Sequence, residues 1–547
     1  MKALATTGAR RSKVAPDLPT IAEPGFPGFD VSSWYAFMVP ARTPGAIVNR
    51  LRDEATKTVA LPDVQQAMSR QGLEVETGTA QQLAARMAKR ARPSWCREGS
   101  VMTARRLILG LLFVSLGVPT TAFLAACTTL SALALIEPPL KSSFDSAMVA
   151  KGAQLAAIGN CNVCHTASGG RPYAGGRPLK TSFGTIYGTN ITPDPESGIG
   201  RWSEAAFSRA MREGVDREGR HLYPAFPYDH FTKVTDEDIK ALYAFVMTRD
   251  PVRAEAPPNE LAFPFNIRSL IGAWKLLYFE RRVFRPDAAQ SAEWNRGAYL
   301  VQGLGHCGAC HTPRNALGAE EKRHDQGGGE VEGWHGPALN AASVTPVPWS
   351  AGQLYVYLRT GLDDLHAIAA GPMEPVVRNL ATVPEQDVRA IATYVATFAG
   401  PPSAARQKKA VDALLQARRD SDAYPLIDRA DHRTAGGDRR FQNGAVVYAG
   451  ACAECHDQGR HASSGGALHL ALGTAMTIPT SVNLIRITLE GIVPPDSEPG
   501  RWMPGFADAL SDEQVKDLVT YIRAHFGREP PWPDVADELR KARQGKR

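Results

Sequence analysis

The chain has 547 residues, and 62 Lys and Arg stand against 56 Asp and Glu, so the formal net charge is +6 at pH 7. This length predicts several domains rather than one. The charge is small for the length and no arginine-rich reading helix accompanies it, so the composition does not indicate a nucleic-acid-binding protein.

Residues 1–95 differ in character from the rest of the chain. Residues 16–23, 29–35 and 39–44 precede a helical pattern that runs from Ala46 to about Val59. These residues resemble the C-terminal part of Bug-type solute-binding proteins of tripartite tricarboxylate transporters. The resemblance implies a small partial α/β fragment that lacks most of its ligand cleft. A working solute-binding protein would have to rest on this fragment alone, and Met102 is a candidate true start.

Residues 102–137 form a targeting segment. Arg105 and Arg106 precede a run from Leu107 to Ile136 without a charged residue. This is the form of a signal segment, and the run is also long enough to span a bilayer. Residues 124–127 resemble a lipoprotein cleavage box with Cys127 as the lipidated residue, whereas residues 132–134 would serve ordinary cleavage. All three alternatives export the following residues, so we expect a protein of the inner membrane whose domains face the periplasm.

A Cys-x-x-Cys-His segment occurs three times in the exported part. The residues are Cys161, Cys164 and His165; Cys307, Cys310 and His311; and Cys452, Cys455 and His456. This signature attaches c-type haem: two thiols form thioethers with the vinyl groups, and the histidine binds the iron from the proximal side.

Two other interpretations of a Cys-x-x-Cys pair are a redox dithiol and half of a zinc site. A redox dithiol needs no following histidine, and a zinc site needs a fourth ligand at a matching spacing. The three segments together use six of the eight cysteines. The sequence therefore predicts three covalently bound haem c groups, with His165, His311 and His456 as proximal ligands.

The three segments lie in three repeated frames, as expected of tandem domains. A Gly-Ala pair precedes each segment at Gly152, Gly297 and Gly444, and each frame closes with an amphipathic helical pattern. Thr235 and Ser511 are predicted N-caps of the closing helices. We expect a mainly α fold of three class I-type cytochrome c domains at 145–250, 291–400 and 436–526, with a linker at 251–290 and a tail at 527–547.

The sixth iron ligands are sought on the loop of each frame. Phe226, Met373 and Met503 each lie 12 residues after a glycine that ends a helical pattern. A thioether sulfur favours the ferrous state and raises the reduction potential. A proline beside each methionine stiffens its loop. Met373 and Met503 are therefore the predicted sixth ligands of the second and third haems.

The first frame departs from this pattern, because the phenylalanine ring of Phe226 cannot bind iron. His230 is our candidate for the sixth ligand there, with His221 and a five-coordinate iron as alternatives. A haem with two imidazole ligands has a lower potential than one with histidine and methionine.

Two further segments carry no haem signature. The apolar and aromatic residues 270–279 predict a helix that packs against a haem domain, with docking to a partner or to a membrane surface as the alternative. The residues beyond Pro530 carry several Lys and Arg and are predicted to be a solvated end.

Residues from about 145 to 526 resemble the membrane-bound tri-haem cytochrome c subunits of bacterial dehydrogenases. The residues that carry the resemblance are 188–193, 198–203, 291–300, 310–315, 333–334 and 337–340. The resemblance implies electron transfer from a molybdenum-, flavin- or PQQ-dependent catalytic subunit to ubiquinone or a terminal oxidase. The substrate of that subunit would be an alcohol, an aldehyde, a sugar acid or an N-heterocycle.

Phe226 bears on the choice of partner. Family members that serve alcohol dehydrogenases carry methionine at this position, so the departure favours an aldehyde or N-heterocycle partner. The sequence shows no acid–base constellation for chemistry on an organic substrate. An enzyme would need an open iron site at the first haem, and we therefore predict an electron-transfer subunit without catalytic residues of its own.

Overall fold

The computed structural model describes residues 130–422, 439–456, 468–492 and 502–545. Of the first 129 residues it describes 11, 17–20, 23, 43–62, 64, 65, 68, 77–79, 81 and 82. The chain divides into two compact units, Met1–Gly110 with Phe506–Ser511 and Leu111–Gly505 with Asp512–Arg547. In the first unit, the helix predicted from Ala46 is confirmed as α1 (Gly45–Val59).

Most of the predicted targeting segment, residues 102–129, lies outside the described residues, as do Cys96 and Cys127. Among the described residues, no helix combines the length and the apolar composition that a bilayer crossing requires.

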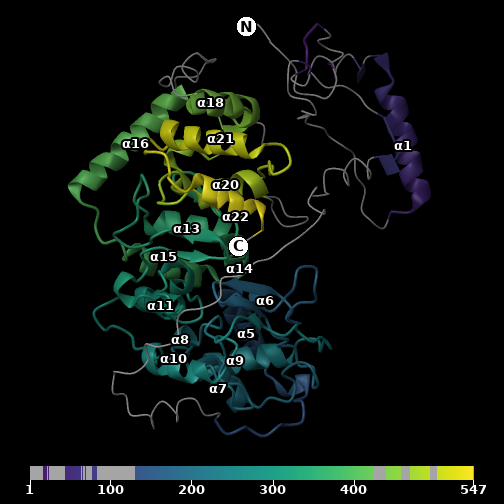
Figure 1. Cartoon of the computed structure of the whole chain (residues 1–547). Coiled ribbons are helices and arrows are strands. Elements are labelled where there is room, and N and C mark those ends of the chain that lie inside the picture. Colours follow the sequence, from purple (N-terminus) through teal and green to yellow (C-terminus); the bar gives the residue numbers. More distant parts are fainter. Residues whose placement is uncertain are drawn as a thin grey trace. The chain divides into compact units, whose positions relative to one another are not determined.

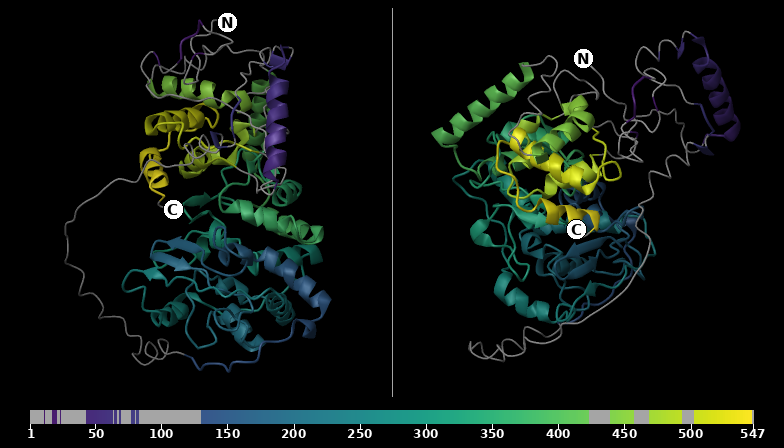
Figure 2. Two further views of the ribbon diagram at one scale, coloured as in Figure 1. Left: turned by 90° about the vertical axis from the view of Figure 1, so that its right-hand side faces the viewer. Right: turned by 45° about the horizontal axis from the view of Figure 1, so that its top comes forward.

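The second unit contains three pairs of crossing helices. The pairs are α5 (Ser146–Ile158) with α9 (Asp236–Met247), α11 (Ala292–Gln302) with α15 (Glu385–Ala396), and α18 (Arg439–Ala451) with α21 (Asp512–His525) (Figure 1). Helices α18 and α21 lie side by side in both further views (Figure 2). Each pair joins the helix before a Cys-x-x-Cys-His segment to the helix that closes the same frame.

Each crossing is built on the glycine of a Gly-Ala pair. A Cβ placed on the glycine would lie 2.0 Å from the backbone oxygen of Ala241 at Gly152, 1.9 Å from that of Ala390 at Gly297, and 2.2 Å from that of Asp517 at Gly444. These distances exclude any side chain, so the two helix backbones meet only because the residue is glycine. Four positions after each of these oxygen-bearing residues, an aromatic side chain also lies against the glycine: Phe245, Tyr394 and Tyr521 respectively.

The helix starts follow the expected capping chemistry. The side chain of Thr235 accepts a hydrogen bond from the backbone of Asp238, which confirms the predicted N-cap of α9. Asp145 and Ser291 cap α5 and α11 in the same way. These bonds satisfy backbone donors that a helix start leaves unpaired.

The loops between the paired helices hold short elements. The remaining helices of the second unit are α6 (Cys161–Cys164), α7 (Glu204–Glu213), α8 (Tyr228–Phe231), α10 (Leu270–Tyr278), α12 (Gly308–His311), α13 (Ala351–Thr360), α14 (Met373–Leu380), α16 (Ala404–Asp422), α19 (Ala453–His456), α20 (Val482–Glu490) and α22 (Val535–Arg543), with 3-10 turns at Lys141–Ser143, Lys322–His324, Leu470–Leu472 and Thr474–Met476. The strands are β1 (Pro178–Thr181), β2 (Gly184–Tyr187), β3 (Glu260–Leu261), β4 (Gly329–Val331), β5 (Trp334–Gly336), β6 (Leu362–Asp363) and β7 (Ala367–Ile368). They form an antiparallel sheet β1-β2-β3 and the hairpins β4-β5 and β6-β7.

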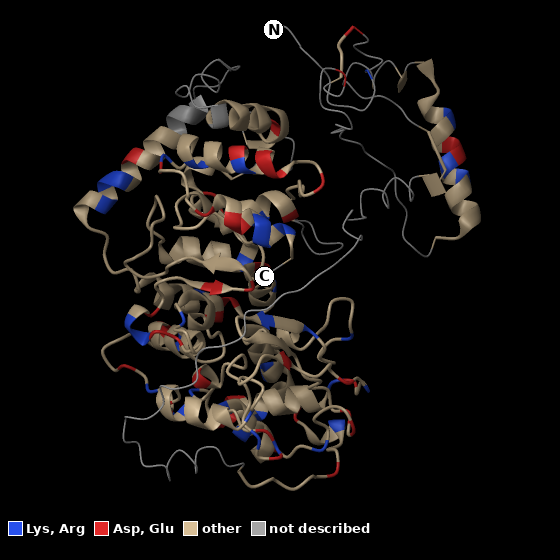
Figure 3. Cartoon of the chain, in the orientation of Figure 1, with Lys and Arg blue, Asp and Glu red and all other residues tan. Residues whose placement is uncertain are grey.

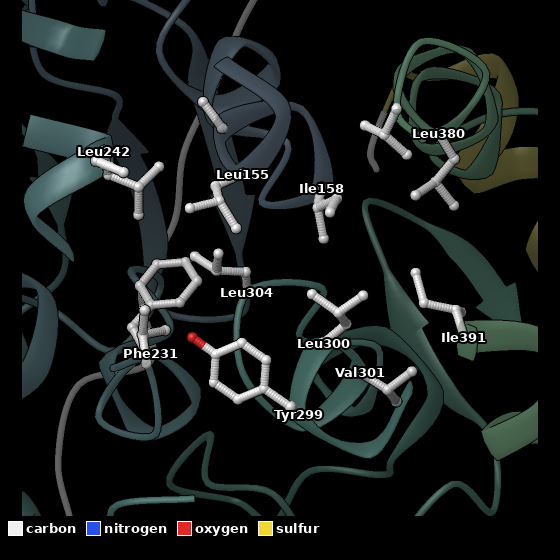
Figure 4. Close-up of a cluster of buried hydrophobic side chains, with 14 of the residues drawn as sticks. Leu155, Ile158, Phe231, Leu242, Tyr299, Leu300, Val301, Leu304, Leu380 and Ile391 are labelled. Carbon is white, nitrogen blue, oxygen red and sulfur yellow. The ribbon is translucent and has the colours of Figure 1, made fainter. Parts of the chain in front are cut away.

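The first two helix pairs share one hydrophobic core. Leu155 and Ile158 of α5 lie in one buried cluster with Leu300 of α11, Leu380 of α14 and Ile391 of α15 (Figure 4). Full burial of such a side chain stabilises the fold by about 1.5–3 kcal/mol. The shared core therefore fixes the first two Cys-x-x-Cys-His segments relative to each other.

A polar contact reinforces this junction. The Asn379 amide in α14 donates to Asn160 Oδ1 at 2.7 Å and to Asn162 Oδ1 at 2.9 Å. Asn160 and Asn379 are both buried. The residues around Cys161 are thus tied to the helix that begins at Met373.

The predicted linker 251–290 is partly ordered against the first domain. β3 adds to the edge of β2, and α10 packs on the loop after α7. The buried Lys275 amine donates to the oxygens of Glu213 and Gly214 at 2.6 and 2.7 Å. The predicted packing of this helix on a haem domain is therefore confirmed, although Leu276 and Leu277 remain exposed.

The prediction of a solvated end beyond Pro530 is wrong. Trp532, Val535 and Leu539 are buried, and the Trp532 indole donates to the backbone oxygen of Ile478 at 2.8 Å. Trp532 lies just before α22, and Val535 and Leu539 lie one turn apart on this helix, which packs against α20. Apolar burial therefore decides the position of this segment, whereas Arg540 and Lys541 are exposed.

Basic and acidic residues are interspersed along the described helices (Figure 3). Several pair along one helix, as Lys408 does with Asp412 of α16 at 2.8 Å. Such exposed pairs contribute little to stability.

Candidate haem-attachment sites

The three Cys-x-x-Cys-His segments each form a single helical turn. The histidine backbone N–H donates to the oxygen of the first cysteine, at 3.1 Å from His165, 3.0 Å from His311 and 3.0 Å from His456. None of these six cysteines forms a disulfide. In a helical turn, residues three and four apart lie on one face, so the thiols and the imidazole can serve one ligand.

The three histidines make the same hydrogen bond. Nδ1–H donates to a backbone oxygen: His165 to Thr189 at 2.6 Å, His311 to Pro337 at 2.7 Å and His456 to Leu468 at 3.4 Å. A carbonyl oxygen is only an acceptor, so each bond selects the tautomer that leaves Nε2 without a hydrogen. A second partner that orients a histidine in this way is characteristic of metal-ligating imidazoles.

Two glycines bring the acceptor loops close enough for these bonds. Gly188 precedes Thr189, and a Cβ on it would lie 1.9 Å from the backbone oxygen of Cys164. Gly336 precedes Pro337, and a Cβ there would lie 2.5 Å from the backbone oxygen of Cys310. The sequence interpretation missed this role, although a glycine directly before each acceptor was a signal that could have shown it.

Burial sets the protonation of the histidines and cysteines in these segments. It lowers the pKa of His165 and of His311, which favours the neutral imidazole that an iron ligand requires. It also raises the pKa of Cys161 and of Cys307 to about 12. Among the described residues, the group of His, Cys, Asp and Glu close enough to hold an ion is Asp229, His230 and Glu320, without a cysteine.

The two predicted methionine ligands lie in different local structures. Met373 begins α14 and packs, half-buried, against the same core as Cys307. Met503 forms two backbone hydrogen bonds with Ile492, of 2.8 and 2.9 Å. Ile492 directly follows Gly491, the glycine that ends α20. Ligation by either sulfur stays a prediction.

His230 lies beside the second segment. Its Nε2 donates to Glu320 Oε1 at 2.8 Å and its Nδ1 to the backbone oxygen of Gln302 at 3.1 Å. A Cβ on Gly308 would lie 3.2 Å from its Cε1. Burial alone would lower the pKa of His230, but the hydrogen bond and the charge of Glu320 raise it. Ligation by His230 at the first site stays a prediction, and this geometry does not favour it.

The alternatives at the first site are also located. His221 is buried, and the Lys275 amine donates to its Nδ1 at 3.2 Å. Phe226 packs on Phe231, with ring centroids 5.2 Å apart, so an aromatic ring stands where the sequence register of the other two frames has methionine.

Three family profiles match separate parts of the chain. The profile of the tripartite tricarboxylate transporter family receptor matches residues 1–106, that of cytochrome c matches 149–250, and that of cytochrome c oxidase, cbb3-type, subunit III matches 439–522. A UPF0065 protein from Pseudomonas sp. strain P51 is 39% identical over 85 residues, which are 15% of this chain and 25% of that protein. The resemblance predicted for the N-terminal fragment is therefore confirmed.

The fructose dehydrogenase cytochrome subunit of Gluconobacter japonicus is 35% identical over 439 residues, which are 78% of this chain and 88% of that protein. The chain belongs to the family of dehydrogenase cytochrome c subunits. The cytochrome c subunit of the quinone alcohol dehydrogenase of Gluconacetobacter polyoxogenes, another member, is 34% identical over 440 residues, 77% of this chain and 88% of that subunit.

A longer relative matches more strongly. A nicotinate dehydrogenase subunit of Pseudomonas putida is 46% identical over 419 residues, which are 75% of this chain. This chain spans only about a third of that relative, 33% of its length. The members of the family are cytochrome subunits of dehydrogenase complexes, which supports electron transfer as the role of this dehydrogenase cytochrome subunit.

Proposed function

We propose that this chain is a tri-haem cytochrome c subunit that carries electrons from the catalytic subunit of a dehydrogenase to ubiquinone or a terminal oxidase. The observation that carries the proposal is the histidine geometry, because His165, His311 and His456 each direct Nδ1–H to a backbone oxygen, and each follows two cysteines that form no disulfide. A bound haem would supply a one-electron centre at each segment.

The residues would divide the work as follows. The six cysteines would hold the macrocycles, and the three histidines would bind iron through Nε2. Met373 and Met503 would each supply a thioether ligand, which favours the ferrous state. At the first site His230 is the candidate for the sixth ligand, with His221 and a five-coordinate iron as the alternatives.

We further propose that the catalytic partner oxidises an N-heterocycle. The nicotinate dehydrogenase subunit is 46% identical to this chain, whereas the fructose and alcohol dehydrogenase subunits are 35% and 34% identical. Phe226 agrees with this choice. The family resemblance implies a methionine at this position in subunits that serve alcohol dehydrogenases, and this chain has a phenylalanine instead.

We also propose a location at the periplasmic face of the inner membrane, attached through residues 102–137. The segment 262–285 supports this location. Of its side chains, Phe263, Leu276, Leu277 and Val283 are 79%, 63%, 72% and 66% exposed. Arg281, Arg282 and Arg285 are exposed beside them. Apolar side chains next to arginines suit a surface of anionic lipid, which is the partner that we assign to this face.

The test is purification of the chain from its own membranes. We expect a large dehydrogenase subunit to accompany it, and we expect nicotinate or a related N-heterocycle to reduce the haems of the complex, as their absorption spectrum would show. Reduction by alcohol or gluconate but not by N-heterocycles would contradict the assigned substrate class. Isolation of the haem protein without a dehydrogenase subunit would contradict the assigned role.

A further inference from the structure

One hairpin of the second domain lies between the ligand loops of its own site and the two neighbouring domains. Hairpin 329–336 consists of β4, the turn residues Glu332 and Gly333, and β5. The turn residues have φ angles of 48° and 75°, the left-handed backbone that closes a two-residue hairpin.

The hairpin supports the proximal side of the second site at both ends. At its start, a Cβ on Gly329 would lie 2.6 Å from the backbone oxygen of Cys310. At its end, β5 leads directly into Pro337, whose oxygen accepts the Nδ1–H of His311 at 2.7 Å. A shift of the hairpin therefore shifts the partner that orients His311.

The hairpin also supports the distal side. The ring of Trp334 in β5 packs against Gly371, where a Cβ would lie 2.3 Å from Trp334 Cε2. Gly371 has a φ of 55° and precedes Met373 by two residues. The position of Met373 thus depends on the ring of a hairpin residue.

The first domain contacts the turn of the hairpin through an ion pair. Arg177 Nη2 lies 2.9 Å from Glu332 Oε2, and the two side chains are 30% and 22% exposed. The backbone oxygen of Arg177 accepts the N–H of Gly188 at 2.9 Å, directly before the acceptor of His165. The pair therefore connects the proximal loops of the first and second sites.

Helix α20 of the third domain forms hydrogen bonds with the backbone of the same hairpin. Asn483 accepts the backbone N–H of His335 at 2.8 Å and donates to its oxygen at 2.9 Å. Arg486, 2% exposed, donates through Nε to the oxygen of Gly333 at 2.6 Å. Two adjacent turns of one helix thus hold both the turn and β5.

We infer that hairpin 329–336 is the element through which the first and third domains hold both axial ligands of the second haem, and that Glu332 and Asn483 are positioning residues for His311 and Met373. The inference rests on the proposed function. Groups that hydrogen-bond to or pack on a metal ligand orient it and tune the metal, and here these groups are held in place by two other domains.

The experiment uses the holo complex from its own membranes, with the variants Asn483→Ala and Glu332→Gln. Each variant has a matched control: Asn443→Ala removes an exposed amide from α18 of the same third domain, and Glu330→Gln removes an exposed charge from β4. Potentiometric titration resolves the haems, and a Met373→His variant identifies the transition of the second haem. The haem content of every sample is measured by mass spectrometry.

We expect Asn483→Ala and Glu332→Gln to shift the potential of the second haem and to weaken its methionine–iron charge-transfer band, with the other potentials and both controls unchanged. An unchanged second potential in both variants would overturn the inference, and so would an equal shift of all potentials. A preparation that lacks haem would instead refute the proposed function, so the two failures are distinguishable.

Discussion

His165 donates its Nδ1 hydrogen to the backbone oxygen of Thr189 over 2.6 Å, a contact between residues 24 positions apart. The bond fixes the tautomer and the direction of the imidazole. His311 repeats it with Pro337. Both imidazoles are therefore held in one direction with Nε2 available, as the proposed iron ligation requires.

Replacement of one attachment cysteine should leave a haem bound by a single thioether. In Cys307→Ala, we expect the second haem to remain attached through Cys310 with the absorption of an unsaturated vinyl group in the alkaline pyridine spectrum. The reason is that His311 keeps its orientation through Pro337. A spectrum identical to that of the wild type would show that Cys307 forms no thioether.

Removal of a methionine sulfur should lower one potential at a time. In Met373→Ala and Met503→Ala, the thioether that favours the ferrous state is absent. We therefore expect the reduction potential of the affected haem to decrease by at least about 59 mV, which corresponds to a tenfold change in the equilibrium constant for one-electron reduction. Redox titration of the holo protein measures it. Met247→Leu, at a core methionine that is 1% exposed, is the control and should leave every potential unchanged. Unchanged potentials in both ligand variants would mean that other residues bind these irons.

The crossing glycines should tolerate no side chain. In Gly297→Ala, the new Cβ would lie 1.9 Å from the oxygen of Ala390, so α11 and α15 must separate. We expect a loss of about 3 kcal/mol or more in unfolding free energy, at the upper end of overpacking effects, measured by denaturant titration. Gly352→Ala in α13 is the control, because the nearest atom lies 4.0 Å away, and it should gain up to about 1 kcal/mol. Equal stability of the two variants would contradict this account of the crossing.

Much of this scaffold could be predicted from the sequence, because its signals are local and repeated. Gly152, Gly297 and Gly444 each stand at a similar distance before a Cys-x-x-Cys-His segment, and the structure places all three at helix crossings. The cap of Thr235 depends only on the next three residues. Features that depend only on neighbouring residues can be predicted without knowledge of the fold.

Contacts between distant segments could not be predicted in this way. His230 stands four residues after Phe226, which suggested the first site, but α8 directs its ring to Glu320, 90 positions later. The solvated tail was inferred from its charges, whereas the apolar side of Trp532 and Leu539 decides its packing. The role of hairpin 329–336 depends on residues of three domains, and no single stretch contains that information.

The exposed apolar face of segment 262–285 should contact lipid. A phospholipid with a photoreactive acyl chain, mixed into the native membranes, should label peptides that contain Phe263, Leu276 and Leu277. The control is α16, where Val411 and Leu415 are 53% and 48% exposed. Basic residues accompany them, at Lys408 and Lys409, but no aromatic side chain does, and we expect this helix to remain unlabelled. Labelling of both segments to the same degree, or of neither, would contradict the assignment.

The central claim is that three haems are bonded covalently to this one chain, and intact-mass spectrometry of protein matured in its own host tests it most directly. The account predicts a mass increase equal to three haem groups, located by peptide mapping on the segments 161–165, 307–311 and 452–456. A chain of unmodified mass would contradict it.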